Sequence, residues 1–173
     1  RPFLPGDAGQ VMDIGCGIAG INALLFHHYQ SIGVKPTINL VDKSEVSSTI
    51  YYEFRRVAAF YNSLDVAKET LEINGVLAGN IRNIEATEFD NFPLPELDVV
   101  ISLSAWGFHF PVDVYVEKIF SAMKPGSCLI MDVRKSTDGL DRLHEYFGRH
   151  DVIFENDRQI RVHLVRPRSG PAG

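Results

Sequence analysis

Blocks of apolar residues recur along the chain with two different spacings. Short apolar runs bounded by Gly, Pro or Asp predict buried parallel strands. Longer stretches with apolar residues three or four positions apart predict amphipathic helices. Strands are predicted at residues 11–14, 37–41, 81–86, 98–103 and 128–131. Helices are predicted at residues 18–29, 50–74 with a break near 61–63, 112–123 and 140–147.

The end of the chain has a different pattern. Residues 152–155 and 160–165 are two short apolar segments with only the polar turn 156–159 between them, which predicts an antiparallel hairpin. Together with the preceding strand–helix units, this predicts an α/β fold: a doubly wound, mostly parallel seven-stranded sheet with an antiparallel β-hairpin at the C-terminal end. We expect residues 1–166 to form a single domain and residues 167–173, rich in Pro, Gly and Ser, to form a flexible tail.

Composition narrows the classes of function. The 173 residues are 45% hydrophobic and carry a net charge of −5, so binding to a polyanion such as nucleic acid is not expected. No apolar run approaches the roughly 20 residues of a membrane span. Cys16 and Cys128 have no partner at metal-ligand spacing, and we expect a reducing, cytoplasmic compartment. His27 and His28 are neighbours on a helix and point in different directions, so no metal site is predicted.

The glycine-rich turn after the first strand carries the clearest chemical signal. Gly15, Gly17 and Gly20 have the spacing G-x-G-x-x-G, and Asp42 ends the second strand about twenty residues later. The first two glycines allow a tight turn and close approach of a ligand, and Gly20 allows the helix to pack closely on the strand. This arrangement predicts a site for a nucleotide-containing cofactor.

Asp13 indicates which kind of cofactor. A carboxylate two residues before the first glycine is an odd neighbour for a pyrophosphate, but it favours an ammonium or sulfonium group at short range. The alternative is that Asp13 only caps or braces the loop. For Asp42, the alternative is an ordinary exposed residue at the start of a loop.

Residues 11–20 resemble motif I of the class I (Rossmann-like) S-adenosylmethionine-dependent methyltransferases. Three further segments, 40–42, 97–102 and 123–131, resemble landmarks of that family in the same order, and the closing hairpin resembles its reversed seventh strand. The resemblance implies S-adenosyl-L-methionine as the cofactor and methyl transfer as the activity. It also implies lid helices before motif I. Only about ten residues precede the first strand here, so we expect either that the lid was removed with the start of the chain or that this is a minimal member.

The resemblance assigns roles to individual residues. Asp13 would hold the amino-acid end of the cofactor, Asp42 would bind the ribose hydroxyls, and Lys43 would flank the adenine. The family's usual adenine-binding Asp is missing, and of the nearby residues we predict Thr87 or Glu88 in its place. The predicted cofactor-binding residues are Asp13, Gly15, Cys16, Gly17, Asp42, Lys43, Thr87, Glu88 and Ser102.

The segment 102–111 follows the fourth strand, where this topology places its substrate pocket. His109 is the candidate catalytic base because its side chain titrates near neutrality; the alternative is a solvent-facing residue before a helix. Ser104 could orient an acceptor hydroxyl and Trp106 could wall the pocket, unless the aromatic residues belong to the core. Asp132, after the fifth strand, is better interpreted as the brace of a loop than as a second acid.

The same segment lacks the Asn/Asp-Pro-Pro-aromatic sequence common in methyltransferases that act on nucleic-acid bases or glutamine. With the acidic net charge, this predicts a hydroxyl of a small-molecule or sugar-like acceptor and argues against nucleic acid. Two alternatives remain. A cofactor-binding, non-catalytic domain of a larger assembly would share the glycine loop and both acids. A nicotinamide-dependent oxidoreductase is opposed by Asp13, by the Lys-Pro-Gly turn and by the final hairpin. The sequence does not predict the oligomeric state.

Overall fold

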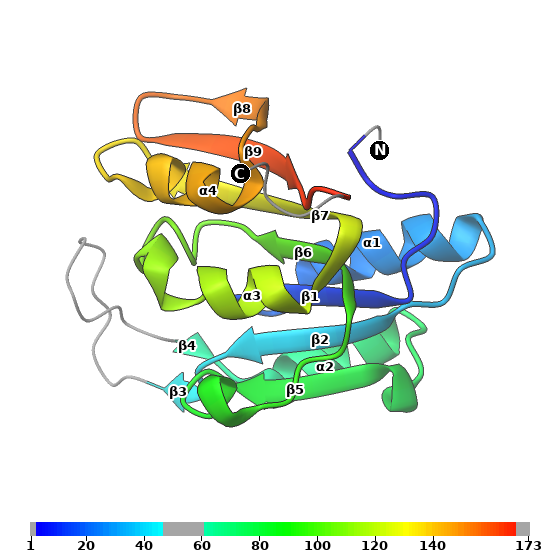
Figure 1. The fold of residues 1–173 in the computed structure, drawn as a ribbon. Helices are drawn as coiled ribbons and strands as arrows, with labels where there is room; N and C mark the ends of the chain where they lie inside the picture. Colours follow the sequence, from blue (N-terminus) through cyan, green and yellow to red (C-terminus); the bar gives the residue numbers. More distant parts are fainter. Residues whose placement is uncertain (1–2, 47–60, 169–173) are drawn as a thin grey trace.

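A seven-stranded sheet runs through the computed structural model, which describes residues 3–46 and 61–168 (Figure 1). Its strands are β1 (Gln10–Ile14), β2 (Thr37–Asp42), β5 (Ile81–Glu85), β6 (Leu97–Ser102), β7 (Met123–Arg134), β8 (Asp151–Glu155) and β9 (Gln159–Val165). The strand order is β5-β2-β1-β6-β7-β9-β8. Strand β9 is antiparallel to both of its neighbours, whereas the other paired strands of this sheet are parallel.

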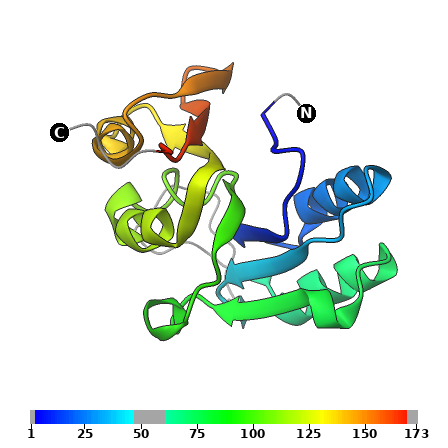
Figure 2. The ribbon, with the colours of Figure 1, turned by 45° about the vertical axis from the view of Figure 1, so that its right-hand side comes forward.

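Helices cover both faces of the sheet. Helices α1 (Gly20–Ser31) and α2 (Leu64–Ile73) lie on one face, and α3 (Val116–Ala122) and α4 (Gly139–Phe147) lie on the other (Figures 1 and 2). Three 3-10 turns, η1 (Ala78–Asn80), η2 (Phe89–Asn91) and η3 (Val112–Val114), complete the described helical segments. A two-stranded ribbon, β3 (Glu45–Val46) and β4 (Tyr61–Asn62), is separate from the main sheet.

The central strands are buried on both faces, which explains their continuous apolar sequences. On the α3–α4 face, Val100 and Leu129 of the sheet belong to the same apolar cluster as Ile119 of α3 and Leu143 of α4. On the other face, a second cluster joins Leu40 to Leu71 of α2. The sheet therefore holds the carboxyl ends of β1, β2 and β6 close together on one edge, because these strands are adjacent and parallel.

The predicted doubly wound sheet with its C-terminal hairpin is confirmed, with local differences. The Lys-Pro-Gly turn at 124–126 lies inside β7 instead of before it, because the Gly126 N–H donates to the Arg166 carbonyl and the pairing with β6 shifts register nearby. The predicted helix 112–123 is divided into η3 and α3. Of the predicted helix 50–74, the described part is strand β4 followed by α2, and 50–60 lie outside the described residues.

The hairpin of β8 and β9 forms one end of the sheet, as predicted. Strand β9 lies between β7 and β8, so the reversed strand is one position in from the edge. Most of the predicted tail, residues 169–173, lies outside the described part of the chain. Within the described part, no helix is long and apolar enough to cross a membrane.

Candidate functional site

The glycine loop between β1 and α1 takes its shape from the end of β2. The N–H groups of Gly15 and Cys16 both donate to the Val41 carbonyl, at 2.8 and 3.3 Å. Gly15 and Gly17 have φ angles of +77° and +54°, in the left-handed region that a residue without Cβ enters freely. The loop is therefore held by protein contacts in the conformation that the motif predicts.

The glycines have different reasons to lack a side chain. A Cβ on Gly15 would lie 2.2 Å from the Ala105 Cβ, so this position admits the loop that follows β6. A Cβ on Gly17 or Gly20 would meet no described heavy atom within 4 Å. Space therefore remains open at Gly17, where a ligand can approach the backbone. The prediction that Gly20 serves close helix–strand packing was wrong, because among the described residues no heavy atom outside its own helix and chain neighbours lies within 4 Å of a Cβ built there.

Asp42 ends β2 directly beside the loop. Its carboxylate accepts the Gly17 N–H at 2.8 Å and the Lys43 N–H at 2.7 Å, and the side chain is 8% exposed. These two donors favour the ionised carboxylate. The Gly17 N–H, which would otherwise meet an anionic ligand, instead points at a negative charge. Cys16, between the two glycines, is buried, and its thiol donates to the Gly17 carbonyl at 3.6 Å.

Asp13 lies on β1 below the loop and is almost completely buried. It accepts one hydrogen bond, 2.6 Å long, from the amide of Asn22 on α1. Burial raises the pKa of Asp13 to about 7, and the negative charge of Asp42 adds to the rise, while the Asn22 hydrogen bond opposes it. Asp13 and Asp42 thus place two carboxyl groups beside the glycine loop, with different surroundings.

The residues predicted near the adenine lie along the neighbouring strand end. Asp42 pairs with Glu85 across the β2–β5 register, and the Glu85 carboxylate accepts the Ser44 N–H at 3.1 Å. Thr87 and Glu88 are exposed in the turn after β5. The structure thus places Glu85, which the sequence did not favour over its neighbours, beside the strand end. Lys43 is half-buried directly after Asp42.

Ser102 joins the end of β6 to the end of β1. Its hydroxyl donates to the Ile14 carbonyl at 2.7 Å and accepts the Trp106 N–H at 3.0 Å, and the residue is fully buried. Both hydrogen bonds lie within the protein, so the hydroxyl braces the loop. A contact from Ser102 to a cofactor stays a prediction.

Asp132 fixes the start of the loop after β6. Its fully buried carboxylate accepts two hydrogen bonds from Arg161 on β9, at 2.8 and 2.9 Å. It also accepts the N–H of Ser104 at 3.0 Å and the hydroxyl of Ser104 at 3.3 Å. Ser104 is one of two described non-glycine residues with a positive φ, at 55°, a conformation that costs energy unless neighbours hold it. Asp132 is the brace that the sequence suggested.

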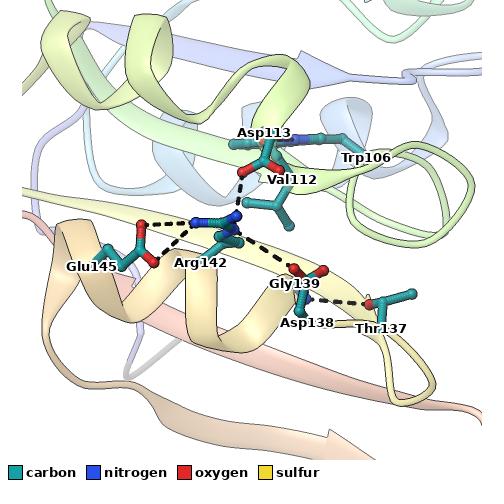
Figure 3. Close-up of polar contacts among 8 residues, drawn as sticks. All are labelled: Trp106, Val112, Asp113, Thr137, Asp138, Gly139, Arg142 and Glu145. Atoms are coloured by element: carbon teal, nitrogen blue, oxygen red, sulfur yellow. Dashed lines mark hydrogen bonds and ion pairs between the residues drawn. The ribbon is translucent and has the colours of Figure 1, made fainter.

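Trp106 lies in the core, which was the alternative to a pocket role. Its side chain is 0% exposed, and the indole N–H donates to the Val112 carbonyl at 2.9 Å. Figure 3 shows how the following turn is tied to α4: Arg142 contacts Asp113 of η3 at 3.6 Å and Glu145 of its own helix at 3.1 Å. The structure therefore gives the indole an anchoring position and no exposed surface for a substrate.

His109 is exposed on the same loop. Its backbone N–H donates to the Ala105 carbonyl at 2.7 Å. Its imidazole ring is perpendicular to the Phe108 ring, with the two centroids 5.0 Å apart. The Arg134 guanidinium lies over the same Phe108 ring, 4.4 Å from its centre. Partial desolvation lowers the pKa of His109, and the positive charge of Arg134 lowers it further. The neutral imidazole that a base requires is therefore favoured near neutral pH.

Solved structures with the same fold are methyltransferases. An rRNA methylase from Streptococcus thermophilus has a TM-score of 0.60 and 14% identity, with 96% of this chain and 90% of that chain covered. A 16S rRNA methyltransferase from T. thermophilus, in complex with AdoMet and guanosine, has a TM-score of 0.61 and 12% identity, with 91% and 37% covered. A precorrin-6y methyltransferase from Geobacter metallireducens has a TM-score of 0.59 and 14% identity, with 93% and 81% covered.

These likenesses define the class of fold. The chain has the fold of the class I S-adenosylmethionine-dependent methyltransferases, as its sequence motifs predicted. No protein-family model and no curated protein matches the chain. The fold is thus established by structure, at sequence identities of 12–16% among the neighbours.

One expectation about partners is corrected by the same neighbours. The acidic net charge and the missing Asn/Asp-Pro-Pro-aromatic sequence argued against nucleic acid. Two neighbours with this fold are named for ribosomal RNA. The argument from charge failed because net charge sums over the whole chain, whereas an RNA contact depends on the local surface.

Gly15→Ala is expected to lower the free energy of unfolding by about 2 to 4 kcal/mol, because the new methyl group meets Ala105 and φ is positive. Gly33→Ala is the matched control, with φ +83° and open space around its Cβ, and should lose only about 1 kcal/mol. Urea denaturation measures both. The second substitution Ala105→Gly should restore part of the loss at Gly15, and equal losses in the two single variants would contradict the contact.

Asp13→Asn is expected to stabilise the protein increasingly as pH rises. Between the ordinary pKa of 3.8 and the folded value of about 7, the folded state binds more protons at Asp13 than the unfolded state. The contribution of Asp13 to the free energy of unfolding of the wild-type protein therefore falls as pH rises through that range, and it stays constant at higher pH. Urea denaturation from pH 4 to pH 8 should show a difference growing to about 2 to 4 kcal/mol. A difference independent of pH would show that Asp13 ionises normally.

Proposed function

We propose that this chain binds S-adenosyl-L-methionine around Asp13, Gly17 and Asp42 and transfers its methyl group to an acceptor at the loop after β6. The observation that carries the proposal is the pair of carboxyl groups flanking the open backbone at Gly17. This arrangement occurs at the carboxyl ends of adjacent strands, where doubly wound sheets bind their ligands.

The residues at the loop fit this cofactor better than a dinucleotide. A pyrophosphate over the loop would face the Asp42 carboxylate, which already accepts the Gly17 N–H. A ribose supplies hydroxyl donors to the same carboxylate, and an ammonium group supplies a cation toward Asp13. The neighbour solved with AdoMet shares this fold, which supports the same choice. Glu85 and Lys43 are the residues nearest the adenine side, and Thr87 and Glu88 remain candidates there.

S-adenosylmethionine supplies a methyl group already activated by its sulfonium. The chain then has to align the acceptor at about 3 Å from the methyl carbon and exclude water. Segment 102–111 does the alignment, because Asp132 and Trp106 anchor it at both ends. His109 would take a proton from a hydroxyl acceptor, and its lowered pKa favours the neutral imidazole that this role requires.

The class of acceptor is inferred from the residues of the loop after β6 and from the neighbours with this fold. A hydroxyl of a small molecule remains the acceptor suggested by His109 and Ser104. RNA is the second candidate acceptor, because neighbours with this fold are named for ribosomal RNA. Phe110, 39% exposed on the same loop, offers a surface on which a base or a sugar can stack. Transfer of a labelled methyl group into separate RNA and small-molecule fractions of a cell extract distinguishes the two classes.

Asp42→Ala is expected to weaken binding of S-adenosylhomocysteine about 10- to 100-fold, because a carboxylate–hydroxyl hydrogen bond is worth about 1 to 3 kcal/mol. Isothermal titration calorimetry measures the affinity, with NAD as the competing candidate. 5′-Methylthioadenosine has the same ribose and no amino-acid end. It should lose as much affinity as S-adenosylhomocysteine in Asp42→Ala and keep its affinity in Asp13→Asn. Binding of NAD in preference to S-adenosylhomocysteine would sink the proposal.

His109→Ala is expected to bind S-adenosylhomocysteine normally and to lose about 100-fold or more in methyl transfer to the fraction that accepts it. The wild-type rate should fall on the acid side, below the ordinary histidine pKa of 6.5, as the imidazole becomes protonated. Single-turnover transfer at pH 5 to 8 measures both effects. Unchanged transfer in His109→Ala would remove the residue from the reaction.

A further inference from the structure

Three carboxylates of this protein, two of them buried and one half-buried, are well supplied with donors. Asp42 accepts two backbone N–H groups. Asp98, near the amino end of β6, accepts two backbone N–H groups at 2.9 Å and the Lys124 ammonium at 2.7 Å. Asp132 accepts both donors of Arg161 and two from Ser104. Each of them has the hydrogen bonds that an ionised carboxylate needs away from water.

Asp13 is supplied differently. Its side chain is 2% exposed, and its one described donor is the neutral amide of Asn22. The residues paired with it on the neighbouring strands are apolar, Leu40 on β2 and Ile101 on β6. The charged group that acts on it is Asp42, whose negative charge opposes a second one nearby. Among the described residues, no cation compensates a negative charge at Asp13.

Asn22 provides a second, independent observation. The residue is fully buried, and its Oδ1 atom has no hydrogen-bond partner among the described residues. The 2.6 Å contact between Asn22 and Asp13 is short for an N–H donor and typical of an O–H donor. Exchanging the oxygen and nitrogen of the Asn22 amide lets a protonated Asp13 donate to Oδ1 at this distance. The exchange moves the Asn22 Nδ2 atom to the position without a partner, so it is the short contact, together with the burial of both residues, that points to a proton on Asp13.

We propose that Asp13 carries a proton before the cofactor binds and gives it up to solvent when the cofactor's ammonium group arrives. The inference rests on the proposed function. The O–H bond of the carboxyl group breaks, its proton passes to the buffer, and the carboxylate that remains faces the ammonium cation. Charge in the site is thereby balanced, because one cation enters as one proton leaves.

The linkage makes cofactor affinity depend on pH. Below the value of about 7 to which burial raises the pKa of Asp13, affinity should rise up to tenfold for each pH unit. Binding should release about one proton at pH 6, about half a proton at pH 7 and little at pH 8. Neutral ligands for the same site should release none.

Titration calorimetry of the whole chain with S-adenosylhomocysteine tests this, in two buffers of different ionisation heat at pH 6, 7 and 8. At pH 6, the binding heats observed in the two buffers should differ by the difference between the buffers' ionisation heats for about one proton per ligand bound. The difference should vanish with 5′-methylthioadenosine, which lacks the ammonium group, and in Asp13→Asn. Asp98→Asn is the control for removing a half-buried carboxylate away from the glycine loop, and it should keep the full proton release.

Equal heats in both buffers at pH 6, with S-adenosylhomocysteine bound, would overturn the inference and leave the proposed function standing. No binding at all would reject the proposed function and this inference with it. Carboxyl ¹³C NMR of the ligand-free protein reads Asp13 directly, with Asp13→Asn identifying its signal. A protonated carboxyl at pH 5.5 supports the proposal, and an ionised one overturns it.

Discussion

The hydrogen bonds that the end of β2 makes to the glycine loop are the constraint on which the candidate site depends. The Val41 carbonyl holds the first turn of the loop, and the Asp42 carboxylate holds Gly17. The loop is therefore shaped by its neighbouring strand. Because β1 and β2 are parallel neighbours, this tie exists only in the register that the sheet imposes. The strand register that forms the sheet therefore also forms the candidate site.

Much of the fold could be predicted because its signals are local. Continuous apolar runs predicted the strands, and the glycine spacing with Asp13 and Asp42 predicted which strand ends meet. The roles of Ser102, Trp106 and Asp132 depend on distant partners. Those partners are the Ile14 and Val112 carbonyls and the Arg161 guanidinium, and no local sequence pattern predicts these contacts. Gly15 is a mixed case: the motif predicted a glycine, and only the structure shows that Ala105 requires it.

The correction about nucleic acid has a related cause. Net charge is a property of the whole chain, whereas the loop after β6 carries its own groups: His109, the exposed Phe110 and Arg134 over Phe108. Acceptor choice is decided on such a small surface. The same fold therefore serves neighbours named for ribosomal RNA and for a precorrin.

The Asp132–Arg161 pair has a consequence for the order in which this protein can mature. Asp132 is buried near the end of β7, and its cation comes from β9, the last of the described strands. As the ribosome delivers the chain from its N-terminus, every part of the glycine loop emerges before Arg161 does. Until then Asp132 lacks the two guanidinium donors that compensate its charge in the folded protein, which disfavours the native loop after β6. A site whose glycine loop is made early is thus completed by β9, which is made much later.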